Sequence, residues 1–182
     1  MTVTKTIQTI DEILNLGIFQ QAKYDEQSVK SDVRSIRLLD CCNSVLEQLY
    51  AEHMADPTRT LVEVVDGVAP LDPQTYRVLK IKDSNGCDVD FHYTSSGIAV
   101  DTDGRYNVTY ARLPRKMSFD DEVILPDPRI TYRLFVYGVI AEYLRRVGDY
   151  ATGESWQQKF DDAITVTVEL RKSARMPTRR WL

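Results

Sequence analysis

Residues 126–149 read PDPRITYRLFVYGVIAEYLRRVGD, and the expected fold of the whole chain is organised around this run. Pro128 suits a first helical turn, where its missing N–H is not needed, and Asp127 is expected to cap that turn. Apolar side chains surround the helix almost completely before Gly148-Asp149 ends it. Such a helix is expected to be either central in the monomer or packed against a neighbouring subunit. The residues expected to make the subunit packing are Phe135, Gly138, Val139 and Tyr143.

Three further helices are predicted where apolar residues recur every three or four positions. They span Thr6 to Leu16, about Ser28 to Met54, and Thr152 to Ser173. The second ends near Pro57, because proline disfavours helix in the residue before it. The third contains a β-branched stretch at 164–168 that is a poor helix former. The second helix is expected to bury Val29, Val33, Ile36, Leu39, Cys42, Leu46, Leu49 and His53, and the third Trp156, Phe160, Ile164, Thr167 and Leu170.

The middle of the chain has a β pattern instead. Short β-branched runs lie between turn signals, and Asn85-Gly86 is a strong hairpin signal because both residues tolerate positive φ. The predicted strands are Thr60–Val65, Tyr76–Ile81, Val89–Tyr93 and Tyr106–Leu113. We therefore predict an α+β protein: a helical bundle with an inserted small antiparallel sandwich or barrel. The bundle is expected to use residues 1–57 and 126–172, the insert residues 58–125, and an extended terminal segment residues 173–182.

Composition limits the possible functions. The 182 residues include 23 Lys and Arg against 27 Asp and Glu, a formal net charge of −4 at pH 7, which argues against a dedicated nucleic-acid binder. The three cysteines are an odd number with two adjacent, so reduced thiols in an intracellular setting are expected. Residues 1–8 lack the apolar stretch of a secretory signal. No membrane association is expected, because no window approaches the roughly 18 apolar residues of a span.

The charge is distributed unevenly. Residues 171–182 carry five cations and no acid, so this segment is expected to dock on an acidic surface or a polyanion. It closes with Trp181 and Leu182, and arginine and aromatic residues are common anchors of protein interfaces. A protein partner is therefore favoured over disorder and over DNA. The expected docking residues are Arg171, Lys172, Arg175, Arg179, Arg180, Trp181 and Leu182.

No catalytic or cofactor-binding constellation is expected. The two histidines, His53 and His92, are interpreted as structural or surface residues, and no zinc-ligand spacing joins them to the cysteines. The runs 83–88 and 101–104 resemble calcium loops, but their glycine stands fourth rather than sixth, so turn chemistry explains them better. Pairs of acids at 120–122 and 161–162 are interpreted as solvated faces or helix-end charges. The prediction is a non-enzymatic protein without cofactor or metal.

The last third of the chain carries a recognisable pattern. Pro126-Asp-Pro opens an apolar helix, AEYLRRVGD follows at 141–149, and Trp156 and Phe160 stand in the next helix before a basic end. With two earlier helices and a β insert, this resembles the head-to-tail adaptor proteins of tailed bacteriophages, also called connectors, portal accessory proteins or tail tubular protein A.

This resemblance implies a structural virion protein located in the neck between head and tail. Family members form a homo-oligomeric ring, commonly a dodecamer, beneath the portal protein. The ring extends the DNA channel and gives tail or nozzle proteins a platform, and DNA passes through without specific binding. The terminal segment reaches onto the portal, which matches residues 171–182 here, and the β insert faces the tail.

Other functions stay open. A head-completion protein of a long-tailed phage is the nearest alternative to an adaptor of a short-tailed phage. A small DNA-binding or regulatory protein that uses the basic segment is an alternative of a different class. A small hydrolase using Asp or Glu and a metal is a third.

Overall fold

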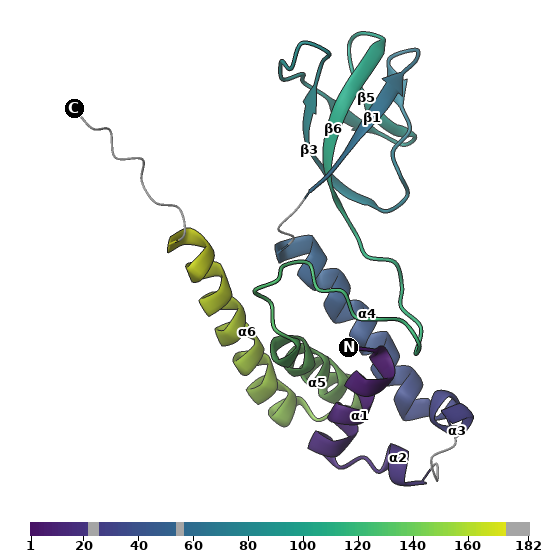
Figure 1. Ribbon diagram of the computed structural model, residues 1–182, viewed down its shortest axis with the longest axis vertical. Helices are drawn as coiled ribbons and strands as arrows, with labels where there is room; N and C mark the ends of the chain where they lie inside the picture. Colours follow the sequence, from purple (N-terminus) through teal and green to yellow (C-terminus); the bar gives the residue numbers. More distant parts are fainter. Residues whose placement is uncertain (22–25, 54–56, 174–182) are drawn as a thin grey trace, which may run out of the picture. The chain divides into compact units, whose positions relative to one another are not determined.

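The computed structural model describes residues 1–21, 26–53 and 57–173, and these form an α+β fold (Figure 1). Among the described helices, none combines the length and apolarity needed to cross a bilayer. The described helices are α1 Val3–Leu14, α2 Ile18–Gln21, α3 Glu26–Ser31, α4 Val33–His53, α5 Tyr132–Val147 and α6 Tyr150–Ser173. The described strands are β1 Thr58–Val64, β2 Val68–Ala69, β3 Thr75–Lys82, β4 His92–Thr94, β5 Gly97–Ala99 and β6 Gly104–Arg112.

Contacts divide the chain into two compact units. Within the described part of the chain, residues 1–46 and 116–173 form the helical unit, and residues 47–115 form the β unit. The insert predicted at 58–125 is therefore too long at its end. Residues 116–123 belong to the helical unit because their backbone is hydrogen-bonded there: Asn43 exchanges two hydrogen bonds with the backbone of Met117, at 2.7 and 3.1 Å.

The start predicted for the helix in the run 126–149 is wrong by about four residues. α5 begins at Tyr132, and Thr131 is its N-cap, with a side-chain oxygen that accepts from the Leu134 amide at 3.3 Å. Asp127 instead accepts hydrogen bonds from the Arg129 amide at 2.9 Å and from its guanidinium at 2.8 Å. Both Asp127 and Thr131 are good capping residues, and the local turn at 127–130 occupies the aspartate.

The predicted second helix is two helices, because the chain breaks at Asp32. The Asp32 carboxylate accepts from the Arg34 amide at 2.7 Å and so caps the start of α4. The break changes the helical phase, so Val33 and Ile36 are exposed (67% and 44%) rather than buried as predicted. The face of α4 that the helical unit buries consists of Ser35, Leu38, Cys41, Cys42, Val45 and Leu46.

α5 and α6 pack against each other in the helical unit (Figure 1). α5 supplies the centre of the core, with Leu134 to Val136 and Val139 to Ala141 all buried. α6 packs through one stripe, on which Phe160 is buried and Trp156, Ile164 and Thr167 are half-buried, as predicted. Its β-branched stretch is helical despite its low propensity. The side chain of Leu170 lies outside the described residues.

The β unit contains two antiparallel three-stranded sheets, in the orders β1-β6-β3 and β2-β5-β4. The turn at 83–87 forms as expected, but the main partner of β3 is β6 and not the strand that follows the turn. The strands β2 and β5 were not predicted, since each has only two or three residues. The core between the sheets consists of Val64, Ala69, Val78, Ile81, Ile98, Val100, Tyr106, Val108 and Tyr110.

Candidate assembly surfaces

The predicted docking segment falls largely outside the described residues. Arg171 and Lys172 lie in the last turns of α6, where only the backbone is described. The residues outside the described part of the chain are Arg175, Arg179, Arg180, Trp181 and Leu182. The described helix therefore leads directly into the basic segment.

The four residues predicted to pack between subunits are core residues of the helical unit. Phe135 and Val139 are fully buried, Tyr143 is 4% exposed, and Gly138 is buried between helices. A β-carbon on Gly138 would lie 2.7 Å from Cε2 of Phe160 in α6 and 2.9 Å from Cγ1 of Val45 in α4. Helices do approach closely at Gly138, but they belong to the same chain, so these residues leave no surface for a neighbouring subunit.

Two aromatic rings with a cation on the outer side of each lie on the surface where α5 meets α6. The Tyr137 and Trp156 rings are 5.4 Å apart, and both side chains are half-buried. The Arg133 guanidinium lies 5.4 Å from the Tyr137 ring centre and donates to its hydroxyl. The Lys159 ammonium lies 4.0 Å from the Trp156 ring centre. We call these four residues the aromatic row; its cation–π contacts are strongest over Trp.

The spacing of the four residues along the sequence already places them in two helical pairs. Arg133 and Tyr137 are four residues apart, and Trp156 and Lys159 three, so each pair lies on one helical face. Trp156 was predicted on the buried face of its helix, and Tyr137 lies in the apolar run at 126–149. The pairing of the two helices brings the rings together, and that pairing is a tertiary feature.

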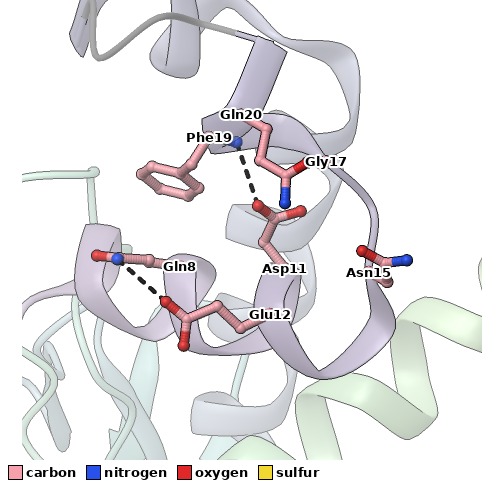
Figure 2. Close-up of a pocket in the computed structure, with 7 residues that line it drawn as sticks. All are labelled: Gln8, Asp11, Glu12, Asn15, Gly17, Phe19 and Gln20. Atoms are coloured by element: carbon pink, nitrogen blue, oxygen red, sulfur yellow. Dashed lines mark hydrogen bonds between the residues drawn. The ribbon is translucent and has the colours of Figure 1, made fainter.

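A second polar feature lies where α1 turns into α2. Here an open cavity of about 560 Å³ is lined by polar side chains and by Phe19 (Figure 2). The Asp11 carboxylate is 5% exposed and accepts from the backbone amides of Ile18 at 2.9 Å and Phe19 at 3.1 Å. Both oxygens thus hold the first turn of α2. We interpret the cavity as a by-product of the tight connection between α1 and α2, which Asp11 stabilises.

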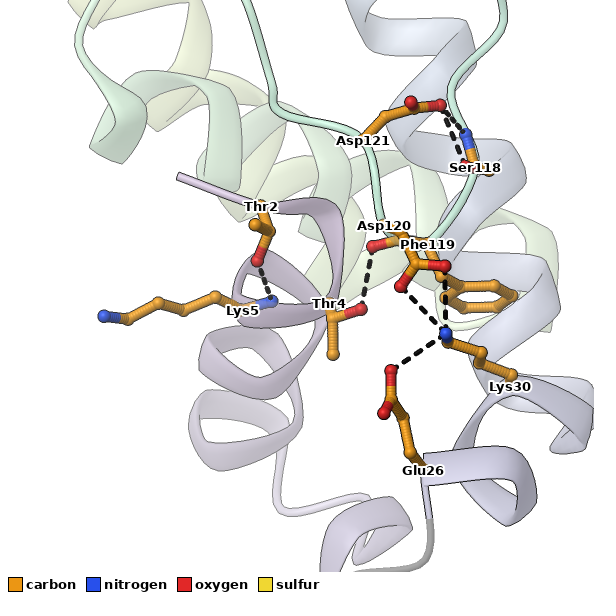
Figure 3. A network of polar contacts seen from close by, with 9 residues as sticks. All are labelled: Thr2, Thr4, Lys5, Glu26, Lys30, Ser118, Phe119, Asp120 and Asp121. Atoms are coloured by element: carbon orange, nitrogen blue, oxygen red, sulfur yellow. Dashed lines mark hydrogen bonds and ion pairs between the residues drawn. The ribbon is translucent and has the colours of Figure 1, made fainter.

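Asp120 and Glu122 of the run Asp120-Asp121-Glu122 are exposed, as expected, but Asp120 and Asp121 also make structural contacts. Figure 3 shows the Lys30 ammonium between the carboxylates of Asp120 and Glu26, at 2.8 and 2.9 Å, and these contacts raise the pKa of Lys30. Asp121 accepts from the amide and hydroxyl of Ser118 at 2.6 and 2.9 Å. The acids therefore shape the segment and attach it to α3.

The same segment covers the start of α1. Free N–H groups at a helix N-terminus need acceptors, and here the amides of Val3 and Thr4 donate to the carbonyls of Asp121 and Phe119 at 3.0 and 3.1 Å. The Thr4 hydroxyl also donates to the Phe119 carbonyl, at 2.8 Å (Figure 3). The chain segment that leaves the β unit is thus bound to the first helix.

Two of the three cysteines are placed for packing. Cys41 and Cys42 are buried in α4, while Cys87 is exposed in the 83–87 turn. Burial raises the pKa of the Cys41 thiol to about 12 and raises that of Cys42 as well, so both are protonated at neutral pH. Within the described residues, no three side chains of the metal-ligating types come together.

The two loops that resemble calcium loops are turns. Asp83 accepts from the amides of Asn85 and Cys87, at 2.9 and 2.8 Å. Asp103 accepts from the amide of Gly67 at 2.7 Å, which joins two neighbouring turns. His92 is exposed on β4, and the side chain of His53 lies outside the described part.

Comparison with known proteins gave no match to this chain, either among protein-family models or among curated protein sequences.

Proposed function

We propose that this protein is a structural virion component, a head-to-tail adaptor of a tailed bacteriophage. In this role it forms a ring beneath the portal protein, extends the DNA channel and gives tail or nozzle proteins a platform. The observation that carries the proposal is the order of the parts. The helical unit is built from both ends of the chain, the β unit is inserted between α4 and α5, and a long final helix leads into five cations.

The attachment of α6 supports a presenting role. Of its described side chains, only Gly153 and Phe160 are buried, so most of the helix surface is exposed. Phe160 fills the space beside Gly138 and fixes the helix to the body. A helix held by one narrow stripe is suited to project a terminal segment toward a partner while its outer surface contacts neighbours.

The aromatic row supports a protein partner over DNA. Arg, Tyr and Trp are enriched among the residues that dominate binding energy at protein interfaces, and here they lie together on the pair of helices that precedes the basic segment. The chain carries four more carboxylates than cations in total. Like charge lowers phosphate binding, which suits a channel through which DNA must slide.

The test is binding to the cognate portal protein. Deletion of residues 173–182 is expected to abolish binding while leaving the thermal unfolding of the body unchanged. Trp181→Ala is expected to weaken binding by about 1–3 kcal/mol, the cost of removing a buried anchor. The matched control is Tyr150→Ala, which removes an aromatic side chain that is 68% exposed at the start of α6. Titration calorimetry gives the affinities, and electron microscopy of the mixture detects a ring.

Two results would contradict the proposal. The first is a truncated protein that binds portal with unchanged affinity. The second is tight DNA binding by the full chain with a steep salt dependence, because that identifies the basic segment as a phosphate-binding element.

A further inference from the structure

We propose that, in the ring inferred above, the outer face of the β1-β6-β3 sheet binds the acidic turns of a neighbouring copy's β unit. This inference rests on the proposed function and specifies the contact between its subunits. Two complementary surfaces of the β unit carry it, one basic and one acidic.

The basic surface follows from strand register. Residues directly opposite each other in antiparallel strands point to the same side of the sheet. Tyr106, Val108 and Tyr110 of β6 point into the core, so Arg105, Asn107 and Thr109 point outward with their partners on β1 and β3. Five cations share this outer side, which we call the basic sheet face: Arg59, Arg77, Lys80, Lys82 and Arg105.

A β-bulge places the lysines on that face. Val78 is opposite Tyr110 and Lys80 is opposite Thr109, so Leu79 is an extra residue in β3. Without the bulge, Val78 and Ile81, which are three residues apart, would point to opposite sides of the strand. With it, both are buried, while Lys80 and Lys82 point outward beside Thr109 and Asn107.

The acidic surface lies at turns of the same unit. Asp66 and Gly67 have φ values of 54° and 73° and form the two-residue turn between β1 and β2. The Asp103 carboxylate accepts from the Gly67 amide at 2.7 Å, which brings the turn at 101–103 against it. Asp66, Asp101 and Asp103 are all exposed, and we call these three residues the acidic turns. Residues 47–115 carry eleven Asp and Glu but seven Lys and Arg, so the basic face belongs to an acidic unit.

A second copy fits the basic sheet face better than nucleic acid does. Leu61 lies on this face opposite Asn107 on the edge strand β1 and is 60% exposed, so the face combines an exposed apolar side chain with charges, as protein interfaces do. Glu63 is on the same face, and Asp88 holds the Lys80 ammonium at 2.9 Å. Carboxylates within and around the face repel phosphates.

The two surfaces are different parts of one molecule, so their contact is heterologous. Each copy would offer its basic sheet face to one neighbour and its acidic turns to the other. A heterologous contact produces a closed ring when the rotation between copies closes. The arrangement therefore matches the symmetry that the proposed function requires.

The first experiment is carbodiimide cross-linking of the full chain, alone and mixed with the cognate portal. This reagent joins a lysine amine to a carboxylate in contact with it as an amide, with loss of water. Mixing ¹⁵N-labelled and unlabelled chains identifies links between copies by mass spectrometry. We expect links from Lys82 or Lys80 to Asp66, Asp101 or Asp103 of another copy. Absence of such links under both conditions overturns the proposal.

The second experiment exchanges the charges. Arg59→Glu with Lys82→Glu is expected to weaken self-association by about tenfold or more, measured by sedimentation of the full chain with and without portal. Adding Asp66→Asn and Asp101→Lys to the same chain is expected to restore self-association in part, because the acidic turns then no longer repel the glutamates placed on the basic sheet face. The control Lys5→Glu with Lys116→Glu changes the net charge equally but at exposed residues of the helical unit. Circular dichroism confirms that each variant is folded.

The outcomes separate the two proposals. A ring on the portal that forms equally well with the reversed face overturns this contact and leaves the adaptor function standing. A chain that never binds portal contradicts the adaptor function. A third outcome is a wild-type chain that binds DNA but does not self-associate, and a charge-changed variant that no longer binds DNA. This outcome overturns the contact and identifies the face as a phosphate-binding surface.

Discussion

The ring of Phe160 occupies the space beside Gly138 so closely that a β-carbon at residue 138 would lie 2.7 Å from its Cε2 atom. This contact joins α5 to α6, and Cγ1 of Val45 in α4 would lie 2.9 Å from the same β-carbon. Three helices thus converge on a glycine. The contact fixes the helix from which the basic segment continues.

Gly138→Ala is therefore expected to destabilise the protein. Overpacking a core costs about 1–3 kcal/mol. The better helix propensity of alanine offsets about 1 kcal/mol of this cost at most. We expect a net loss of about 1–2 kcal/mol in the free energy of unfolding, measured by urea denaturation. The control is Gly153→Ala in α6, where the added carbon meets the flexible Arg145 side chain at 3.3 Å. Equal stability of Gly138→Ala and wild type would contradict the packing.

Phe160→Leu tests whether the same contact is responsible. Leucine lacks the ring atoms that collide with a β-carbon at residue 138, so it relieves the overpacking. The double variant Gly138→Ala/Phe160→Leu is expected to lose less stability than the two single variants together. Additive losses in the double-mutant cycle would assign the cost of Gly138→Ala elsewhere.

Asn43→Ala is expected to release the segment that follows the β unit. The Asn43 amide both donates to the Met117 carbonyl and accepts from its N–H, so alanine leaves two backbone groups without their partner. Loss of a buried hydrogen-bond partner costs about 1–3 kcal/mol. Faster hydrogen exchange at the Met117 amide is the specific measurement. Gln8→Ala, which removes only an exposed side-chain hydrogen bond to Glu12, is the control.

The Asp32 carboxyl at the start of α4 is expected to make the free energy of unfolding depend on pH in the acid range. Hydrogen bonds from the Arg34 side chain lower the pKa of the Asp32 carboxyl. Because the folded-state pKa is depressed, this contribution is complete above the unfolded pKa of about 4 and is lost as pH falls through the folded value. The stability difference between wild type and Asp32→Asn, about 1 kcal/mol at pH 7, is expected to shrink as pH drops below 4. A difference that stays constant from pH 7 to pH 2 would contradict this assignment.

The thiols should react selectively. Burial raises the pKa of Cys41 to about 12 and also that of Cys42, so only Cys87 is expected to react with a thiol reagent in the folded protein at pH 8. All three should react after denaturation. Cys87→Ser is expected to abolish the fast reaction. Rapid labelling of a second thiol in the folded state would show that α4 opens locally.

Much of the architecture could be predicted from local pattern. The apolar residues of α5 predicted a helix that is either central in the monomer or packed against a neighbouring subunit. The stripe from Trp156 to Thr167 predicted the packed face of α6, and turn signals located the β unit. Errors occurred where two local signals compete. Asp127 and Thr131 are both good capping residues, and the sequence does not reveal that the Asp127 carboxylate accepts hydrogen bonds from Arg129. In the same way, the capping of α4 by Asp32 shifted the buried face away from Val33 and Ile36.

The candidate surfaces were less predictable. The four residues assigned to subunit packing are apolar and helical, which a sequence cannot divide between a core and an interface. The aromatic row requires α5 and α6 to pair, and the basic sheet face requires the register of β1, β6 and β3 together with the bulge at Leu79. Register and bulges depend on contacts between distant segments, so periodicity along one strand does not contain them.

The sequence by itself determined the class of the protein: helices at both ends, a β unit between them, and a concentration of cations in residues 171–182. These features follow from local periodicity, turn chemistry and composition, which act over a few residues. Tertiary structure decided which apolar residues are core, because burial depends on what packs against them. It also decided that the lysines of β3 share one face with arginines of β1 and β6, because side chains from separate strands meet only once the sheet has formed.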